Sequence, residues 1–445
     1  MRRGANPLQV TAARRPDLQP PKLPRLLAGP AGRAVGLIEH ERVHGPFPLP
    51  AAPDRSDRHS ARRLVDLIDR SGLTGRGGAG FPTGRKLRSV AAASGRPVVV
   101  ANCAEGEPAS EKDKVLLTRS PHLVLDGINI AAHAVGADRA FIAIHDQEAR
   151  LGWRLESVAA ERAAAGIDLI PIEVVGIPGR YVSSEQSAIV HFLNDGIPLP
   201  TFSPPRTHER GYKGRPTLVN NAETLAHVAL IARHGDRWFK AAGVPGAPGT
   251  MLVTLSGAVA RPGVYEVEAG TPIGTVLGAA GGLAESCQAF LLGGYFGAWL
   301  PANVAWKLPL THRDARAVGA ALGAGVIVAL PETSCGLVET ARVVRYLASE
   351  TAGQCGPCVF GLPALADAFD DLAYRGRPGS ARQTARLTDL VAGRGACKHP
   401  DGAVQLARSA LNAFGHHAAR HEQRGPCNGL HRPPVLPLPG NLANW

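Results

Sequence analysis

The sequence predicts an α/β layered domain, followed by a small β-rich module and a C-terminal helical bundle. Strand-like apolar runs alternate with helical patterns between residues 97 and 194, and this alternation is typical of α/β layers. Two alternating apolar segments around Arg261-Pro-Gly263 predict a β-hairpin. From Cys335 onward helical patterns dominate, which indicates a helical bundle.

The composition narrows the class of protein. The chain has 445 residues, a hydrophobic fraction of 44% and a net charge of +12, as expected for a multidomain globular protein. No apolar run reaches the ~18 residues of a spanning helix, and the start has no apolar signal region. We therefore expect a cytoplasmic protein that meets a membrane only through partners. Its seven cysteines then favour metal or redox use over disulfides.

Five segments are predicted along the chain. A Pro- and Arg-rich extension at residues 1–59 is expected to be mostly disordered, and a Pro-rich tail covers residues 423–445. The extension is basic, but its charges are scattered among prolines without a nucleic-acid motif, which favours a solvated arm. Between these ends lie the α/β domain at 60–243, the β-rich module at 250–330 and the helical domain at 335–422.

The elements follow from apolar spacing and helix caps. Ser60 is expected to cap a helix that runs directly into a glycine loop. Strands are predicted at 97–101, 140–144, 167–175, 251–259 and 261–267. Helices are predicted at 122–135, 147–165, 185–194, 337–349, 362–372, 381–392 and 403–419.

The glycine loop is the first candidate site. Gly75, Gly77 and Gly80 match the spacing G-x-G-x-x-G, but the dinucleotide fingerprint requires a preceding strand, and a helix is predicted here. Glycines still let backbone N–H groups approach a phosphate closely, and Lys86 adds a positive charge. From the pattern alone, a phosphate-binding loop and a structural glycine turn are equally supported.

Polar residues after two further segments are the next candidates. Glu105 and Glu107 follow the strand at 97–101, where α/β sheets bind ligands; the alternative is an acidic solvated turn. Asn220 or Asn221 is expected to cap a helix, and hydrogen bonding to the edge of a cofactor ring is the sharper alternative.

Cysteines near the C-terminus suggest a metal site. Cys355 and Cys358 form a C-x-x-C pair, and Cys397 follows. With His399 they would suit tetrahedral zinc. Without it they would suit an iron–sulfur cluster that lacks one ligand, and free buried cysteines are the third possibility.

Five motifs, taken in order, resemble one family. They lie at 75–86, 102–108, 181–188, 215–224 and 352–358. Together they resemble the flavin- and NADH-binding subunit of respiratory complex I and its relatives in soluble hydrogenases and formate dehydrogenases, from about residue 60 to 420.

The resemblance implies an α/β flavin domain that is not a standard Rossmann fold, a ubiquitin-like β-grasp module of the soluble-ligand-binding type, and a four-helix iron–sulfur domain. It implies cofactors FMN, NAD(H) and a 4Fe-4S-type cluster on Cys355, Cys358 and Cys397. It implies cofactor contacts from Gly75, Arg76, Gly77, Gly78, Gly80, Phe81, Lys86, Asn102, Glu105, Glu107, Tyr181, Glu185, Gln186, Asn220 and Asn221. Among these, Phe81 and Glu107 would lie beside the nicotinamide, and Glu107 is the catalytic candidate.

The chain departs from the family pattern at four positions. Ala104 replaces an aspartate, Ser184 a glycine, Gln186 a glutamate and Ala352 the first cluster cysteine. The neutral Gln186 leaves the choice between NADH and NADPH open. Because alanine cannot bind a metal, the fourth cluster position is expected to be open or filled by a group other than cysteine at 352.

Three residues are candidates for that fourth position. Cys335 lies one predicted helix upstream, and a 15-residue helix spans over ~20 Å, so we expect it to be too far away. Cys427 lies in the tail and could fold back, and His399 is the nearest nitrogen.

The predicted function is electron transfer. A hydride from NAD(P)H would pass to FMN, and single electrons would leave through the cluster to an acceptor protein or a small ferredoxin-like subunit. The alternative is a degenerate scaffold subunit of the same fold, with structural zinc or no metal. No nucleic-acid partner is expected.

Overall fold

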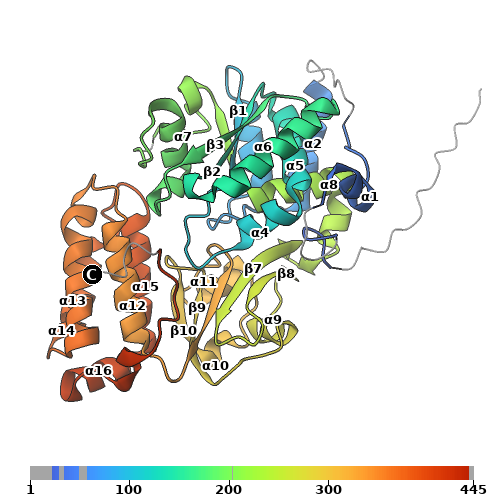
Figure 1. The fold of residues 1–445 in the computed structure, drawn as a ribbon. Coiled ribbons are helices and arrows are strands. Elements are labelled where there is room, and N and C mark those ends of the chain that lie inside the picture. The colour runs from blue at the N-terminus through green and yellow to red at the C-terminus, as the bar shows by residue number, and fades with distance from the viewer. Residues whose placement is uncertain (1–22, 30–34, 50–57, 203, 440–445) are drawn as a thin grey trace, which may run out of the picture.

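A four-stranded parallel sheet forms the centre of the first domain in the computed structural model, which describes residues 23–29, 35–49, 58–202 and 204–439. Its strands are β1 (Val98–Asn102), β2 (Ala140–His145), β3 (Ile172–Ile177) and β4 (Thr217–Asn221). They lie side by side in the order β3-β2-β1-β4. This parallel sheet with helices on its faces confirms the predicted α/β layers (Figure 1).

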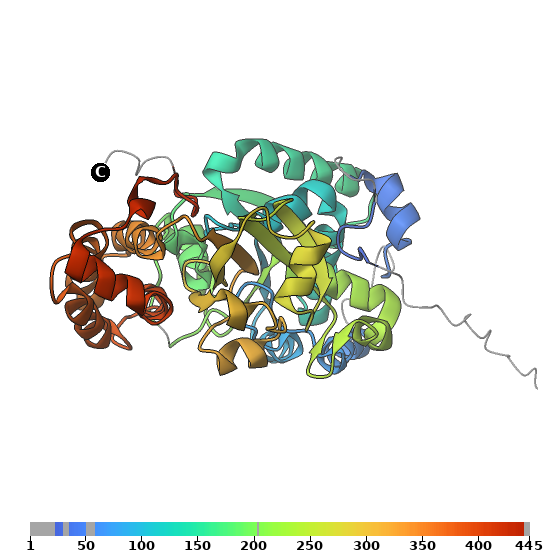
Figure 2. The same ribbon diagram turned by 90° about the horizontal axis from the view of Figure 1, so that it is seen from below.

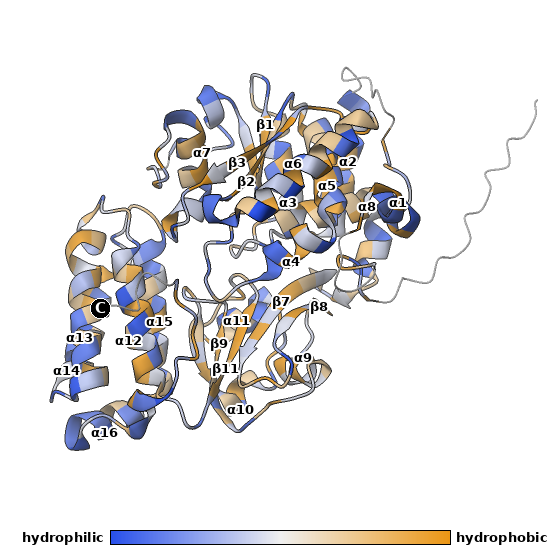
Figure 3. Cartoon of the chain, in the orientation of Figure 1, coloured by the Kyte–Doolittle hydropathy of each residue, from blue (hydrophilic) through white to orange (hydrophobic). Residues whose placement is uncertain are grey.

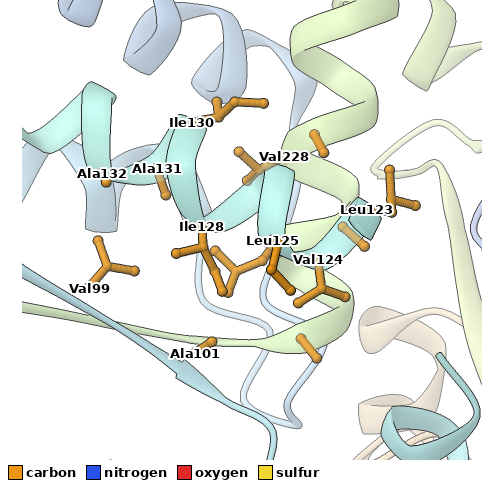
Figure 4. Close-up of a cluster of buried hydrophobic side chains, with 14 of the residues drawn as sticks. Val99, Ala101, Leu123, Val124, Leu125, Ile128, Ile130, Ala131, Ala132 and Val228 are labelled. Atoms are coloured by element: carbon orange, nitrogen blue, oxygen red, sulfur yellow. The ribbon is translucent and has the colours of Figure 1, made fainter. Parts of the chain in front are cut away.

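Both faces of β1 are buried, as expected for a central parallel strand. Val99 and Ala101 pack on one face against α5 (Pro121–Val135) and α8 (Ala222–Lys240), as Figure 4 shows. Val98 and Val100 belong to a second cluster on the other face. The alternation of side chains along a strand assigns successive residues to opposite faces.

The other helices of this domain surround the sheet. They are α2 (Arg58–Ser71), α3 (Thr83–Ala91), α4 (Lys112–Arg119), α6 (Ala149–Ala164) and α7 (Gln186–Asp195). Of these, α7 packs through Ile189 and Val190 onto the face of β1 opposite α5.

Strand β3 begins later than predicted, at Ile172 instead of residue 167. The Leu169 N–H donates to Asn129 Oδ1 at 2.7 Å, and Arg162 Nε donates to Asp168 Oδ1 at 2.8 Å. These side-chain contacts hold the apolar run at 167–171 in a turn, so apolarity alone extended the predicted strand too far.

A mixed five-stranded sheet forms the second domain, below the first in Figure 1. Its strands are β7 (Thr250–Gly257), β8 (Gly263–Glu268), β9 (Cys287–Leu292), β10 (Ala298–Pro301) and β11 (Val326–Pro331). The order is β10-β9-β11-β7-β8. The antiparallel β7–β8 pair confirms the predicted hairpin, and β11 runs parallel to β7.

Short elements complete this part of the chain. They are the two-residue strands β5 (Gly243–Val244) and β6 (Ala247–Pro248), and the helices α9 (Ile273–Ala279), α10 (Ala302–Ala305) and α11 (His312–Ala317). Figure 3 shows apolar residues concentrated on the strands of both sheets.

The third domain is helical and stands beside the mixed sheet (Figures 1 and 2). It contains α12 (Gly336–Ser349), α13 (Leu362–Asp370), α14 (Ser380–Val391), α15 (His399–Ala413) and α16 (Gly415–Arg424). The helical bundle is therefore confirmed, but the single helix predicted at 403–419 is wrong. The helix starts earlier, and Phe414, with φ −115° and ψ 23°, ends α15 before Gly415.

The described parts of both terminal segments pack on the folded domains. A short helix, α1 (Leu37–His44), follows Val35, and Leu26 is fully buried. The N–H groups of Arg25, Leu26 and Leu27 all donate to the carboxylate of Glu266 on β8.

At the other end, Leu436 is only 1% exposed, and its N–H donates to Glu339. The remaining parts of the predicted extension and tail lie outside the described residues. Within the described ranges, no helix has the length and apolar character needed to cross a membrane.

Candidate functional site

The strand order reverses at the carboxyl ends of β1 and β4. From β1 the chain continues to β2 and β3 on one side, while β4 lies on the other side. In open α/β sheets, ligands bind where the order reverses in this way. In the register of the two strands, Asn102 lies opposite Asn221 and Ala101 opposite Asn220. The structure therefore gathers the three predicted asparagines at one edge.

These asparagines have different partners. Asn221 Oδ1 caps α8 by accepting from the Glu223 N–H at 3.0 Å, so the expected helix cap is confirmed. Asn102 Nδ2 donates to the Ser184 carbonyl at 2.9 Å. Asn220 is only 6% exposed, and its Nδ2 has no hydrogen-bond partner among the described residues. A buried donor of this kind is costly unless it is satisfied, so Asn220 is free to bind a ligand.

The glycine loop at residues 75–80 packs against the end of β4. The Gly75 N–H donates to the Phe81 carbonyl at 2.8 Å and closes the loop. A Cβ atom on Gly77 would lie 3.2 Å from Asn221 Cβ, and Gly80 has φ +63°. Close approach and a left-handed backbone therefore favour glycine at these two positions. The Phe81 side chain is 50% exposed.

Two other members of this loop face the second domain. Gly78, with φ +119°, faces Gly323 of the second domain. The Arg76 side chain turns inward, where Nη2 donates to the Pro248 carbonyl at 3.3 Å and Nε lies 4.0 Å from the buried Glu223. Its contacts therefore join the first two domains.

Lys86, on α3, reaches from the glycine loop to the carboxyl end of β4. Its Nζ donates to Gln186 Oε1 at 2.9 Å and to the carbonyl of Val219, the residue before Asn220. Burial lowers the pKa of Lys86 to about 8, and Glu185 acts in the opposite direction. A cation that lacks a full anionic partner at the end of β4 suits a phosphate or another anion.

Glu105 is engaged within the chain. Its carboxylate accepts from the Asp113 and Lys114 N–H groups, each at 3.2 Å, and from the Ser110 hydroxyl. Burial and the neighbouring Asp113 raise the pKa of Glu105 to about 7. This side chain therefore shapes the acidic loop by holding the start of α4.

Glu107 joins the first two domains. Its Oε2 accepts from the Tyr181 hydroxyl at 3.0 Å and from the Tyr295 N–H at 2.7 Å. Its Oε1 accepts from the Ala109 N–H at 3.2 Å. Burial raises the pKa of Glu107 to about 7, although these donors oppose the shift. Glu107 and Tyr181, both predicted as cofactor-binding residues, are thus in direct contact.

Tyr181 also touches the helical domain. Its N–H donates to Glu350 Oε2 at 2.8 Å, and its ring packs on Phe296 and His399 at centroid distances of 4.7 and 5.8 Å. Arg180 Nη2 donates to the Thr351 carbonyl at 3.1 Å. The loop that starts at Arg180 therefore lies against the turn that leads to the cysteines.

A cleft of about 880 Å³ opens beside α7, within the roughly 300–1,000 Å³ typical of ligand pockets. Glu185, Gln186 and Cys397 line it, together with basic residues. The basic ones are Arg206, Arg210, Lys213 and Lys398. Glu185 caps α7 by accepting from the Ser187 and Ala188 N–H groups. Asn102, Asn220, Asn221 and the glycine loop do not line this cleft. The Lys86–Gln186 hydrogen bond connects the cleft with the end of β4.

A buried charge network next to the site was not predicted from the sequence. Lys112 Nζ lies 2.8 Å from Asp113 and 3.1 Å from Glu223, and it donates to Asn221 Oδ1 at 3.3 Å. Burial acts to lower the pKa of Lys112, but the carboxylates outweigh it and raise that pKa. The charged run Glu111–Lys114 is typical of a solvated turn, so no local signal marks Lys112 as buried.

The three predicted cluster cysteines lie around one turn. Cys358 is 2% exposed, and Cys355 and Cys397 are half-buried. The Ala352 N–H faces Cys358 Sγ. Burial, and to a smaller extent the neighbouring Cys355, raises the pKa of Cys358 to about 12. For Cys355, burial is outweighed by the N–H groups of Ala396 and Cys358, and its pKa is lowered. Position 352 is therefore part of the cysteine site.

The two sulfur candidates for the fourth position lie elsewhere, whereas His399 keeps a buried Nδ1 without a hydrogen-bond partner among the described residues. The buried His399 donates from Nε2 to the Leu347 carbonyl at 2.7 Å. Cys427 lies with Cys335 and His421, within 4.8 Å of both. The suggestion that Cys427 folds back to the cluster is wrong, and Cys335 is, as expected, at the far end of α12.

A mononuclear zinc site on Cys355, Cys358, Cys397 and His399 is not supported either. Among the described residues, the only group of three such ligand atoms within 4.8 Å of one another is Cys335, His421 and Cys427. Thiolates of an iron–sulfur cluster bind different irons and do not need to converge on one point.

Known proteins match each domain of this chain. The family model described as Nuo51 FMN-binding domain matches residues 68–230, and SLBB domain matches residues 252–290. The model described as NADH-ubiquinone oxidoreductase-F iron-sulfur binding region matches residues 339–421.

A solved NAD⁺-reducing [NiFe]-hydrogenase in its H₂-reduced state superposes with a TM-score of 0.76 at 30% identity. That match covers 85% of this chain, which in turn spans 64% of the hydrogenase chain.

Two curated relatives show the family. The second F subunit of NADH-quinone oxidoreductase in Rhizobium meliloti (strain 1021) is 31% identical over 378 residues, which cover 82% of this chain and 90% of the relative. The corresponding F subunit of Aquifex aeolicus is 32% identical over 331 residues, covering 71% and 75%. Identity at this level over nearly the whole length of a relative, with matches to all three domains, places the chain in the family of NADH-quinone oxidoreductase F subunits.

Proposed function

We propose that this chain is an electron-transfer oxidoreductase subunit that oxidises NADH with FMN and passes single electrons through an iron–sulfur cluster to a partner. The observation that carries this proposal is the unpartnered Nδ2 of the buried Asn220. It lies one residue from the carbonyl that Lys86 contacts, at the reversal point of the parallel sheet. An amide donor beside a cation suits an anionic, polar-edged cofactor such as FMN.

The residues at the carboxyl ends of β1 and β4 fit FMN. Lys86 would meet the phosphate, and the glycine loop at 75–80 would allow close approach of backbone N–H groups. Asn220 would donate to an acceptor of the cofactor, and Asn102 is already oriented by the Ser184 carbonyl. The bound flavin supplies the conversion of a two-electron hydride transfer into one-electron steps.

The sequence departures in this site replace two acidic side chains of the family pattern with neutral ones. Gln186 accepts from Lys86 through Oε1, a role that a glutamate would also fill, with one negative charge more. Ala104 is buried in an apolar cluster with Val98 and Val100. The chain therefore keeps its cation at the predicted phosphate position while losing negative charge nearby.

Glu107 is the residue placed to position the donor. Ionised, it accepts from the Tyr181 hydroxyl, the Tyr295 N–H and the Ala109 N–H. One carboxylate thereby fixes the acidic loop against Tyr181 of the same domain and against the loop of the second domain that carries Tyr295. We infer that it orients the nicotinamide end of the substrate and excludes water from that side.

Three thiolates fit an iron–sulfur cluster with an incomplete ligand set. Cys355, Cys358 and Cys397 each receive backbone N–H groups, from Ala396, Ala352 and His399 among others. Such donors tune the reduction potential of a cluster. With alanine at 352, one iron lacks its protein ligand, and we expect a cluster that is readily lost in air or converted to a three-iron form.

The finer assignments belong to the same proposal. The mixed sheet at 250–331 would be a β-grasp module of the soluble-ligand-binding type, because a parallel β7–β11 pair lies between two antiparallel pairs and packs on α9. The partner would be an acceptor protein or ferredoxin-like subunit, in the cytoplasm or at the surface of a membrane complex.

The absorption spectrum of anaerobically purified protein tests the assignment. We expect flavin bands with a broad iron–sulfur shoulder, and bleaching of the flavin in a stopped-flow mixture with NADH. NADPH is the comparison, because Gln186 lowers the negative charge that would repel a 2′-phosphate. A colourless protein, or flavin bands that neither nucleotide bleaches, would contradict the proposal.

The contribution of Asn220 is testable separately. Asn220→Asp keeps the shape but replaces the free donor with an acceptor, and we expect weaker flavin retention. Asn428→Asp, on an exposed residue after α16, is the matched control and should retain flavin like the wild type. Equal retention in both variants would remove Asn220 from the site.

A further inference from the structure

A second group of thiols lies at the opposite end of α12 from the predicted cluster. Cys335 precedes this helix and Ala352 follows it. The 14-residue helix separates the two places by about 21 Å at ~1.5 Å per residue. Cys335, His421 and Cys427 are therefore not ligands of the cluster, and the electron-transfer function does not use them.

The ligand atoms of these three residues already lie close together. Their sulfur and nitrogen atoms are all within 4.8 Å of one another, and Cys335 Sγ lies 3.8 Å from His421 Nε2. With a Zn–S bond of ~2.3 Å and a Zn–N bond of ~2.0 Å, a tetrahedral centre separates its S and N ligands by about 3.6 Å. The observed spacing needs only a small adjustment to bind an ion.

The tautomer of His421 suits coordination. Its Nδ1 lies 3.2 Å from the Leu372 carbonyl, to which it can only donate. Nε2 therefore carries a lone pair, which accepts from the Cys427 N–H at 3.1 Å. A histidine that donates its other ring N–H to a backbone carbonyl is the usual arrangement for a metal ligand. Binding of a cation exchanges the Cys427 hydrogen bond for a coordinate bond.

The surroundings suit a buried thiolate site. Cys335 is 1% exposed and His421 is fully buried, while the half-buried Cys427 leaves a path for an ion. The N–H groups of Leu337 and Val338, in the first turn of α12, face Cys335 Sγ. Backbone donors of this kind stabilise a thiolate once a cation is present.

We propose that Cys335, His421 and Cys427 form a binding site for a single thiophilic cation of the zinc class. Two thiolates and one imidazole are a donor set that Zn²⁺ accepts in tetrahedral geometry, with one position left for solvent. The site joins three separate segments: the start of α12, the helix α16 and the loop after it. Its role is to fix the C-terminal segment on the helical domain.

Metal content of the full-length protein tests this proposal. The chain is expressed with zinc and iron supplied, purified anaerobically and analysed for both metals. We expect about one zinc per chain in addition to the iron. Cys427→Ser should lose the zinc and keep the iron, because serine is a poor zinc ligand of nearly the same size. Cys355→Ser should lose iron and keep zinc.

A control and an optical probe make the result specific. Cys287→Ser, on a half-buried cysteine of the mixed sheet, should retain both metals. Cobalt added in place of zinc should give thiolate-to-metal absorption that His421→Asn weakens.

Three results would overturn the proposal: no zinc in the wild type, zinc retained by Cys427→Ser, or a Cys335–Cys427 disulfide in the anaerobic protein by mass spectrometry. Thermal unfolding of Cys427→Ser shows whether the variant is folded. If it is not, the cobalt spectrum of His421→Asn decides alone.

Discussion

Lys86 holds a positive charge where the glycine loop, β4 and α7 meet. Its three contacts are the carbonyl of Val219, the amide of Gln186 and the more distant charge of Glu185. None of them neutralises the ammonium group in full. A phosphate would do so, and this makes Lys86 the residue whose replacement most directly tests the flavin site.

We predict that Lys86→Ala weakens flavin binding by ~1.5–3 kcal/mol, the value of a hydrogen bond to a charged group. This corresponds to a roughly ten- to hundredfold rise in Kd, measurable by flavin fluorescence. Arg85→Ala, on the exposed neighbouring residue, removes a positive charge that does not contact the end of β4, and this variant should bind flavin normally. If both variants bind alike, Lys86 does not contact the phosphate.

The lowered pKa of Lys86 predicts a pH dependence. Because the group deprotonates above about pH 8, flavin affinity should fall by up to ~tenfold per pH unit above that value. Lys86→Met, which cannot titrate, should show no such fall. Titrations at pH 7 and pH 9 distinguish the variant from the wild type, and an equal slope in both would assign the dependence to another group.

The free energy of unfolding of the flavin-free protein should rise with pH, whereas the flavin affinity falls. The folded state loses the Lys86 proton near pH 8, and the unfolded chain near the ordinary value of 10.5. Between these values the unfolded state binds more protons, so this group makes the free energy of unfolding rise with pH. Below pH 8 the buried charge is a cost to folding.

At the scale of elements, the turn between α12 and α13 determines how many cysteine ligands the cluster has. It carries Cys355 and Cys358, and the N–H of Ala352 faces Cys358 Sγ. Residue 352 therefore lies at the cysteine site. The alanine there removes one thiol, while the surrounding helices of the bundle are present.

We predict that Ala352→Cys completes the ligand set. Iron per chain should rise from about three to four, the complement of a cubane with a full set of thiolates, and the absorption of the cluster should survive longer in air. Ala348→Cys, which adds a thiol within the preceding helix, is the control and should leave the iron content unchanged. Iron analysis with EPR gives the answer, and an Ala352→Cys protein with wild-type iron would show that another group already fills the fourth position.

The division of the last predicted helix is a second lesson at this scale. Ala403, Leu406 and Ala410 are buried at helical spacing, and the pattern continues through Ala418. The turn at Phe414 lies inside that pattern because its ring packs on Trp299 at a centroid distance of 5.4 Å. Packing against another domain is not visible in local periodicity.

At the scale of the whole molecule, the C-terminal segment around Leu436 packs into the hydrophobic core. Leu436 is 1% exposed, the Tyr295 hydroxyl donates to the Pro437 carbonyl, and Glu339 accepts from the N–H groups of Val435 and Leu436. Contacts with two domains hold this segment in place, although its proline-rich composition gives no sign of docking.

Leu436→Ala is therefore expected to destabilise the protein by ~2–5 kcal/mol, the range for removing a buried leucine side chain. The thermal unfolding midpoint should fall, whereas Arg432→Ala, on an exposed residue of the same segment, should leave it unchanged. An unchanged midpoint for Leu436→Ala would mean that the tail is not docked in solution.

The sequence by itself determined the order of the domains, most strands and helices, and the family, because these depend on local periodicity and on motifs of fixed spacing. It also predicted Asn102, Lys86 and Glu107 as site residues. Only the tertiary structure decided which of the polar side chains are free. Glu105 and Asn221 hold the starts of helices, while Asn220 keeps a donor without a partner among the described residues.

Only the structure shows which residues Cys427 lies next to. Nothing in the local sequence distinguishes a tail cysteine that returns to the cluster from one that meets Cys335 and His421 at the other end of α12. Contacts between residues far apart in the chain are set by how complete helices pack, and no pattern within one segment encodes that packing.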